Sequence, residues 1–175
     1  MEKIQTLVKK LIDVKAVKFG DFILSSGKKS DVYVDIKLAS TYPDILELIT
    51  SVMVEKIATL DFDKIACIEL GGVPLVVSLA LKVKKPYVIL RKQKKGYGIK
   101  ADYIGEIEEN DNFIVVEDVT TTGNSAMSVV DRLRRYNANV VAVVAVVDRE
   151  EGAESRFEKF IPLLKLSQLR NATKY

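Results

Sequence analysis

Two adjacent carboxylates followed by a run of hydroxyl-bearing residues form the most chemically capable segment of this sequence. Glu117 and Asp118 follow the apolar run 113–116, and residues 120–125 read TTTGNS. Hydroxyl groups and the unpaired N–H groups at the start of a helix bind phosphate, and the positive end of the helix dipole adds to this. Carboxylates can accept hydrogen bonds from sugar hydroxyls or hold Mg²⁺ through water. The segment therefore predicts a site for a sugar phosphate.

The same residues also fit an ordinary junction between a strand and a helix. In that interpretation Thr and Ser only cap the helix, and residues 120–125 alone fit both interpretations equally. The acidic pair changes the balance, because adjacent carboxylates at the end of a buried strand repel each other. Desolvating them is costly without a cation or hydrogen-bond donors. We therefore favour a ligand site.

Positive charge is concentrated in residues 91–100, which read RKQKKGYGIK and carry five cations and no anion. Since the whole chain carries +3, the rest of the chain sums to −2. Such a local charge suits a small polyanionic ligand. A Lys-rich segment is also typical of a solvated surface or of the edge of a sheet, and the segment alone does not separate these interpretations.

Histidine is absent and cysteine occurs once. Ser-His-Asp and Cys-His nucleophile systems, His-ligated zinc and imidazole proton transfer are therefore excluded. Cys67 lies in an apolar run and is predicted to be a buried thiol, since one cysteine cannot form an internal disulfide. Without a signal peptide or an apolar stretch long enough to span a bilayer, we expect a cytoplasmic protein with no membrane association.

The elements that must position these residues follow from short apolar runs. Their β-branched composition predicts strands, with helical or loop segments between them. The last run, VVAVVAVV, does not alternate, as is typical of a parallel strand covered on both faces. The sequence thus predicts an α/β fold with a doubly wound, mostly parallel sheet flanked by helices. The strands are expected at 64–68, 87–90, 113–116 and 140–147.

Apolar spacing also predicts helices and a hairpin. Residues 4–12 have one apolar stripe, a second helix begins at Pro43, and a third has Ala126, Val129, Val130 and Leu133 on one face. Two short strands, at 22–24 and 32–36, flank a Ser/Gly/Lys turn and predict a hairpin. With 175 residues and no linker, we expect a single domain over 1–175.

Three loops should meet at one edge of this sheet. They comprise residues 69–72 (ELGG), 117–125 (EDVTTTGNS) and 148–152 (DREEG). Each follows a predicted strand, and ligands of such sheets bind beyond the carboxyl ends of the strands. We therefore expect the acidic pair to lie close to the other two loops.

The segment VVEDVTTTGNS resembles the 5-phosphoribosyl-1-pyrophosphate (PRPP) signature of type I phosphoribosyltransferases. The segments FGDFILSSGKKSDVYVDIK, ELGGVPL, RKQKKGYGIKADYIGEI and DREEG resemble, in the same order, those of orotate phosphoribosyltransferases. The resemblance runs from about Phe19 to Gly152. It implies that residues 1–40 supply the N-terminal helix and a hood that covers the base.

The resemblance implies a role for each matching residue. Lys95, Asp118 and Arg91 would be catalytic, and Lys95 would belong to a loop that reaches the neighbouring subunit. Arg149 would bind the orotate carboxylate, although it could instead pair with Asp148, Glu150 or Glu151. The PRPP-binding residues would be Gly71, Gly72, Arg91, Lys92, Lys95, Glu117, Asp118, Thr120, Thr121, Thr122, Gly123, Asn124 and Ser125. The orotate-binding residues would be Ser26, Gly27, Tyr33, Thr121 and Arg149.

The implied reaction transfers the 5-phosphoribosyl group from Mg²⁺-bound PRPP to orotate, giving orotidine 5′-monophosphate and pyrophosphate in pyrimidine biosynthesis. Mg²⁺ would be held mainly by PRPP, and through water by Glu117 and Asp118. The resemblance also implies a homodimer that shares the 91–103 loop. Tyr97 stands where many relatives carry histidine, so imidazole cannot transfer a proton there.

Two alternative functions remain at this point. One is a phosphoribosyltransferase that uses uracil or a purine. The other is a catalytically inactive relative that binds PRPP or a nucleotide and regulates nucleic acid. The basic segment is the main support for the second, but it has one aromatic residue, and no other basic tract accompanies it. That is a small surface for nucleic-acid binding, so nucleic acid is not the expected partner.

Overall fold

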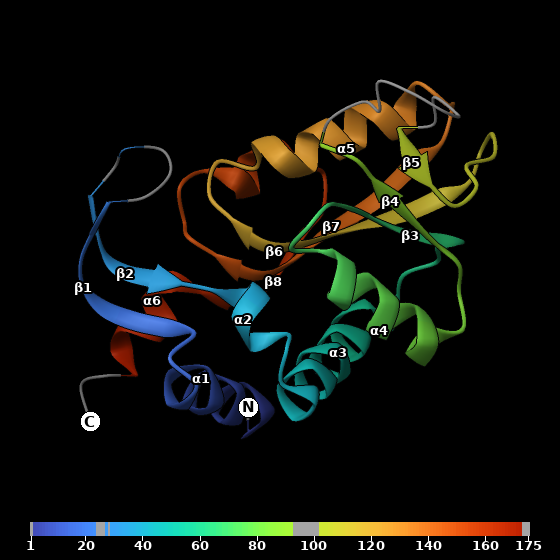
Figure 1. Cartoon of the computed structure of the whole chain (residues 1–175). Helices are drawn as coiled ribbons and strands as arrows, with labels where there is room; N and C mark the ends of the chain where they lie inside the picture. Colours follow the sequence, from blue (N-terminus) through green and yellow to red (C-terminus); the bar gives the residue numbers. More distant parts are fainter. Residues whose placement is uncertain (1, 24–26, 28, 93–101, 173–175) are drawn as a thin grey trace.

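The computed structural model describes residues 2–23, 27, 29–92 and 102–172 (Figure 1). In this part of the chain the central sheet has six strands in the order β5-β4-β3-β6-β7-β8. All neighbours are parallel except β5, which is antiparallel to β4 at the edge. The expected doubly wound, mostly parallel sheet is confirmed. The strands are β3 (Lys64–Ile68), β4 (Tyr87–Leu90), β5 (Tyr103–Ile104), β6 (Asn112–Thr120), β7 (Asn139–Asp148) and β8 (Phe160–Lys165).

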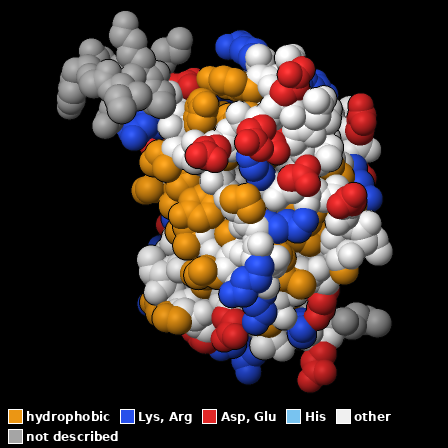
Figure 2. Space-filling view, turned by 90° about the vertical axis from the view of Figure 1, so that its right-hand side faces the viewer, with side chains coloured by type: hydrophobic (Ala, Val, Ile, Leu, Met, Phe, Trp, Pro, Cys, Tyr) orange, Lys and Arg blue, Asp and Glu red, His pale blue; other side chains and the backbone are white. Residues whose placement is uncertain are grey.

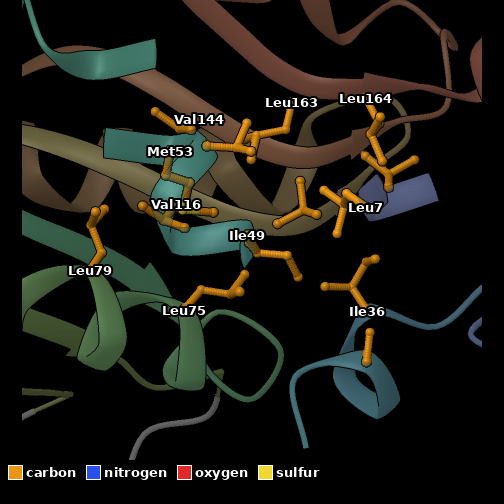
Figure 3. Close-up of a cluster of buried hydrophobic side chains, with 14 of the residues drawn as sticks. Leu7, Ile36, Ile49, Met53, Leu75, Leu79, Val116, Val144, Leu163 and Leu164 are labelled. Atoms are coloured by element: carbon orange, nitrogen blue, oxygen red, sulfur yellow. The ribbon is translucent and has the colours of Figure 1, made fainter. Parts of the chain in front are cut away.

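Helices cover both faces of the sheet (Figure 1). α3 (Pro43–Ile57) and α4 (Val73–Val83) pack on one face, and α5 (Asn124–Arg134) packs on the other. The strand with the non-alternating sequence, β7, is buried from Ala142 to Asp148, as a strand between two helical layers must be. Figure 3 shows how side chains of α3, α4 and the sheet meet in the core.

The N-terminal part forms a separate layer beside one end of the sheet (Figure 1). It consists of α1 (Glu2–Asp13), the antiparallel pair β1 (Val17–Ile23) and β2 (Lys29–Val34), and the short α2 (Ile36–Ala39). The predicted helix and hairpin are both present. The second strand ends earlier than expected because the Asp35 carboxylate accepts a hydrogen bond from Leu38 N at 3.0 Å and starts α2.

The end of β6 lies further along the chain than the sequence predicts, which changes where the site residues lie. Residues 117–125 were expected to form a loop, but β6 continues through Thr120. The reason is its neighbour, because Glu117, Val119 and Thr120 of β6 pair in parallel register with β7. Glu117 and Asp118 therefore lie on a strand, and the turn is confined to the residues between Thr120 and α5.

The chain ends with the 3₁₀ helix η1 (Ala153–Arg156), strand β8 and α6 (Leu166–Asn171). The strand β8, the helix α6 and the two-residue strand β5 are not predicted by the sequence pattern. None of the described helices has both the length and the apolar character needed to cross a bilayer.

Candidate functional site

The candidate site lies where the strand order changes direction. From β3 the chain moves to β4 on one side, and from β6 it moves through β7 to β8 on the other. The carboxyl ends of β3 and β6 therefore flank the switch point, which is where doubly wound sheets bind ligands. The loop 69–72 follows β3, and the acidic pair and the hydroxyl-rich turn are at the end of β6.

Two glycines bring the loop after β3 against the acidic pair. A Cβ atom on Gly71 would lie 2.0 Å from Asp118 Oδ2, so only glycine permits this approach. A Cβ atom on Gly72 would lie 2.6 Å from Cys67 Cβ and 3.1 Å from the Val116 carbonyl oxygen. The structure thus brings the predicted Gly71 next to Asp118, whereas the predicted Gly72 is buried against β3 and β6.

The two carboxylates differ in their surroundings. Glu117 is 6% exposed, and its Oε1 atom has no hydrogen-bond partner among the described residues. Burial, and then the neighbouring Asp118, raise its pKa to about 8, whereas Lys92 acts to lower it. Asp118 accepts a hydrogen bond from Val119 N at 2.9 Å and lies 3.4 Å from Lys37 Nζ. Among the described residues, the buried Oε1 atom of Glu117 therefore has no hydrogen-bond donor, and the charge of Lys92 only partly offsets the cost of burial.

The turn after β6 lines a cleft of about 260 Å³ together with Glu117 and Glu151. Gly123 has a φ of +81° and forms the N-cap of α5, a left-handed conformation that favours glycine. The Oγ1 atom of Thr120 is buried and makes no hydrogen bond to any described residue. The predicted residues Thr120, Thr121, Thr122, Gly123, Asn124 and Ser125 all line this cleft, and the last two belong to the first turn of α5.

Arg156 of η1 makes hydrogen bonds to this turn. Its guanidinium donates to the Thr122 carbonyl oxygen at 2.9 Å and to the Asn124 side-chain oxygen. The backbone N–H of Arg149 donates to the Thr120 carbonyl oxygen at 2.8 Å. The turn is therefore anchored to the β7–β8 connection at both of its ends.

The basic residues expected to contact a polyanion begin at the end of β4. Arg91 N donates to the Asp102 carbonyl oxygen at 2.8 Å, and Lys92 N donates to Glu69 Oε1 at 2.9 Å. The second bond ties the basic segment to the loop after β3. The Nε atom of Arg91 is buried without a partner in the described part of the chain. Lys95 lies outside the described residues.

A second, larger cleft of about 870 Å³ lies between the hairpin and the ends of β7 and β8. The nearly buried Arg149 lines it and donates to Ser30 Oγ at 2.9 Å and to the Val32 carbonyl oxygen at 3.3 Å. Its Nε atom pairs with Glu151 at 3.2 Å, so the expected acidic pairing is present. Glu151 lines both clefts and places them side by side.

The remaining predicted orotate residues are less closely associated with this cleft. Gly27 and Tyr33 are exposed and are not among the residues that line either cleft. The Tyr33 ring packs against Phe22, with 5.7 Å between ring centroids. Ser26 lies outside the described residues. Its contact with a base therefore remains a prediction, as do those of Gly27 and Tyr33.

Sequence analysis missed three residues that shape the site. Lys37 faces Asp118, and Glu69 accepts a hydrogen bond from Lys92 N. Arg156 donates a hydrogen bond to the Thr122 carbonyl oxygen in the turn. Each acts on a residue at least 23 positions away in the sequence. The sequence marks the loop that contains Glu69, but a single charged residue carries no periodic signal, so the partners of all three residues are not predictable locally.

Comparison with known proteins identifies the same family that the sequence motifs resemble. Residues 40–169 match the model of the phosphoribosyl transferase domain. An orotate phosphoribosyltransferase of Archaeoglobus fulgidus is 59% identical, over 95% of this chain and 91% of that protein. The crystal structure of the orotate phosphoribosyltransferase from Aeropyrum pernix superposes with a TM-score of 0.86 at 28% identity, covering 96% of this chain and 98% of that one.

A third relative was solved with a ligand. The orotate phosphoribosyltransferase of Mycobacterium tuberculosis in complex with PRPP has a TM-score of 0.79 and 27% identity, covering 96% of this chain and 99% of that one. The family model spans well over half of the chain, and the archaeal relative covers nearly all of it. The chain therefore belongs to the orotate phosphoribosyltransferase family, within the phosphoribosyl transferase domain fold.

Proposed function

We propose that this protein transfers the 5-phosphoribosyl group from Mg²⁺-bound PRPP to orotate, giving orotidine 5′-monophosphate and pyrophosphate in pyrimidine biosynthesis. One observation carries the proposal most directly. At the switch point of the sheet, Glu117 of the acidic pair and a hydroxyl-rich helix start line one cleft, and two buried oxygens, Glu117 Oε1 and Thr120 Oγ1, have no hydrogen-bond partner among the described residues. Buried polar atoms of this kind are normally satisfied, and a sugar phosphate supplies the missing groups.

The ligand runs from the turn to the end of β4. The 5′-phosphate accepts hydrogen bonds from the turn 120–125 and the N-terminus of α5. The ribose hydroxyls donate to Glu117 and Asp118. Gly71, Gly72, Arg91 and Lys92 then face the pyrophosphate, because Gly71 adjoins Asp118 and Lys92 is tied to Glu69. Lys95 joins this group in the proposal, on the family resemblance alone.

The acidic pair suits Mg²⁺ that arrives with PRPP. No group of three or more His, Cys, Asp or Glu side chains within the described residues could hold a metal ion by itself. A pair of carboxylates instead matches Mg²⁺, which keeps several waters and binds through one or two carboxylates and substrate phosphates. When bound, the ion neutralises charge on the leaving pyrophosphate. A nearby cation also favours the ionised form of Glu117, whose pKa burial and Asp118 raise to about 8.

Orotate occupies the larger cleft under the hairpin. The Arg149 guanidinium is the group there that matches a carboxylate, since a planar guanidinium binds a carboxylate with two parallel hydrogen bonds. In the described structure it bonds to Glu151, Ser30 and Val32. Orotate therefore replaces at least one of these partners when it binds.

The chemical difficulty of the reaction is charge. A polyanionic group leaves an anomeric carbon that becomes cationic, so fixed cations around the pyrophosphate stabilise the transition state more than the ground state. Removing one preorganised donor of this kind costs about two to three orders of magnitude in rate. Arg91 and Lys92 supply such cations, and no imidazole is required.

The decisive experiment measures pyrophosphate release from Mg²⁺-bound PRPP with orotate, uracil, hypoxanthine or xanthine as the acceptor. We expect turnover with orotate and little or none with the other bases, and activity lost with EDTA and restored by Mg²⁺. Turnover of a purine without orotate would overturn the substrate assignment. An unchanged rate in EDTA would overturn the role of the metal.

We further propose that the protein acts as a homodimer in the cytoplasm, with the 91–103 loop shared between subunits. Large apolar side chains such as Leu70, Leu81 and Ile104 are more than half exposed, and Figure 2 shows hydrophobic side chains gathered in a patch on one face. Contiguous apolar surface of this kind marks contact sites in many proteins. The free thiol of Cys67 is buried, which is consistent with a reducing compartment.

A further inference from the structure

Arg132 lies on α5, outside the groups assigned above to substrate binding and catalysis. Its Nη1 atom donates to the Arg91 carbonyl oxygen at 2.7 Å. Its Nη2 atom donates to the Asp102 carbonyl oxygen at 2.6 Å and to the Asp102 carboxylate at 2.9 Å. The Arg132 side chain is 15% exposed, so the three bonds are largely shielded from water. One guanidinium thus joins Arg91, which follows β4, to Asp102, which precedes β5.

These contacts lie at a joint between α5 and the edge of the sheet. Arg91 N donates to the Asp102 carbonyl oxygen, so the two residues already pair with each other. The Tyr103 and Tyr136 rings pack edge to face, with 5.4 Å between centroids, and add a second contact across the joint. The position of Arg91 is therefore set by α5 as well as by β4.

The same helix begins at the phosphate-binding turn. Gly123 is its N-cap, and Arg132 lies eight positions after the first helical residue, Asn124, which corresponds to about 12 Å along the axis. α5 is buried along Ala126, Val129, Val130 and Leu133 and so is held firmly on the sheet. A rigid helix with one end at the turn and a guanidinium fixed to Arg91 determines the separation between the two ends of the PRPP site.

We propose that Arg132 is a positioning residue for PRPP, which fixes the main chain of Arg91 relative to the phosphate-binding turn so that the Arg91 side chain meets the pyrophosphate. The inference rests on the proposed function. Arg132 does not touch the substrate itself. It acts because a guanidinium has several donors in a fixed planar arrangement and can satisfy three acceptors on two chain segments at once. A lysine has a single ammonium at the end of a flexible chain and cannot hold the same geometry.

The main test compares Arg132→Met with Arg134→Met, an exposed residue on the same helix that loses the same charge. We expect Arg132→Met to lower kcat/KM for PRPP by about 100-fold, the cost of a misplacement of about 1 Å at a reacting group. KM for PRPP rises and KM for orotate does not. Arg134→Met should match the unaltered enzyme. Arg132→Lys keeps the charge and should fold, but it should still show most of the loss in kcat/KM for PRPP. It therefore replaces Arg132→Met in the test if Arg132→Met does not fold.

A double-mutant comparison separates positioning from a general contribution to folding. If Arg132 acts through the Arg91 side chain, adding Arg132→Met to Arg91→Ala costs little beyond Arg91→Ala alone, whereas independent effects add. Additive losses, or a fall in the amount of active enzyme with KM for PRPP unchanged, would overturn the proposal. An unaltered enzyme that fails to use PRPP and orotate would instead refute the proposed function.

Discussion

Glu117 is the residue whose surroundings most clearly depart from those of an ordinary surface carboxylate. Burial and the adjacent Asp118 raise its pKa from 4.5 to about 8. Between these values the folded protein keeps a proton that the unfolded chain releases. Stability is therefore greatest at low pH in this window and falls as the pH rises through it. The chain has no histidine, so no side chain of that type titrates in the same range.

This gives a prediction for Glu117→Gln, which has no proton to lose. In the ligand-free unaltered protein, the free energy of unfolding should fall between pH 5 and pH 8, by up to about 1.4 kcal/mol per pH unit for one proton. In Glu117→Gln that part of the slope should disappear. Urea unfolding at pH 5, 6.5 and 8 measures how the free energy of unfolding depends on pH in each of the two proteins. Equal slopes in the two proteins would show that Glu117 is ionised throughout.

The two adjacent glycines should respond differently to the same substitution. In Gly71→Ala the new Cβ atom meets the end of the Asp118 side chain, which can move aside, so we expect little change in stability. The displaced carboxylate should lower kcat/KM for PRPP by about 100-fold. PRPP kinetics alongside urea unfolding test this. Activity equal to that of the unaltered enzyme would show that Asp118 need not stay where it is.

Gly72→Ala is the matched comparison. Here the Cβ atom meets Cys67 Cβ and the Val116 backbone, neither of which can move without disturbing the core. We expect a loss of about 1 to 3 kcal/mol in the free energy of unfolding, as for other overpacked sites. A stable Gly72→Ala protein would mean that the loop after β3 shifts as a unit.

At the scale of elements, the phosphate-binding turn depends on η1 as much as on α5. Arg156 of η1 bonds to the Thr122 carbonyl oxygen and to Asn124. Arg156→Met should therefore loosen the turn and weaken binding of ribose 5-phosphate by about 10-fold, within the range for a hydrogen bond to a charged group. Binding of pyrophosphate alone should not change.

Competition of ribose 5-phosphate and of pyrophosphate against PRPP measures the two affinities separately. Lys159→Met removes an exposed positive charge from the same region and serves as the control. Equal weakening by both substitutions would point to a general effect of charge rather than to the turn. A loss of pyrophosphate affinity in Arg156→Met would also contradict the prediction.

The elements themselves were predictable to different degrees. The bounds of β3 and β4 match the predicted runs because each is a short, mostly apolar segment that is followed directly by a charged residue, Glu69 or Arg91. β8 was missed because Pro162 interrupts its sequence. Proline is tolerated on an edge strand, and β8 is the last strand of the sheet. Only the tertiary arrangement shows that it is an edge.

For the whole molecule, the proposed dimer makes a testable prediction. Light scattering should give the mass of two 19.5-kDa chains. If a loop of one subunit completes the site of the other, Lys95→Ala and Asp118→Ala should each be nearly inactive. Subunits refolded together should regain up to about a quarter of full activity, since half of the dimers are mixed and each has one intact site. A monomer, or a mixture without recovery, would contradict sharing of the loop.

The sequence by itself determined the four inner strands of the sheet, the order of the loops at its carboxyl edge and the acidic and hydroxyl residues that can hold a sugar phosphate. Those features depend on local runs of residues, which impose their own periodicity and chemistry. Tertiary structure alone decided that Glu117 Oε1 is buried with no hydrogen-bond partner among the described residues and that Lys37 faces Asp118. It also placed Arg132 on Arg91, because contacts between residues far apart in the chain form only when packing brings their elements together.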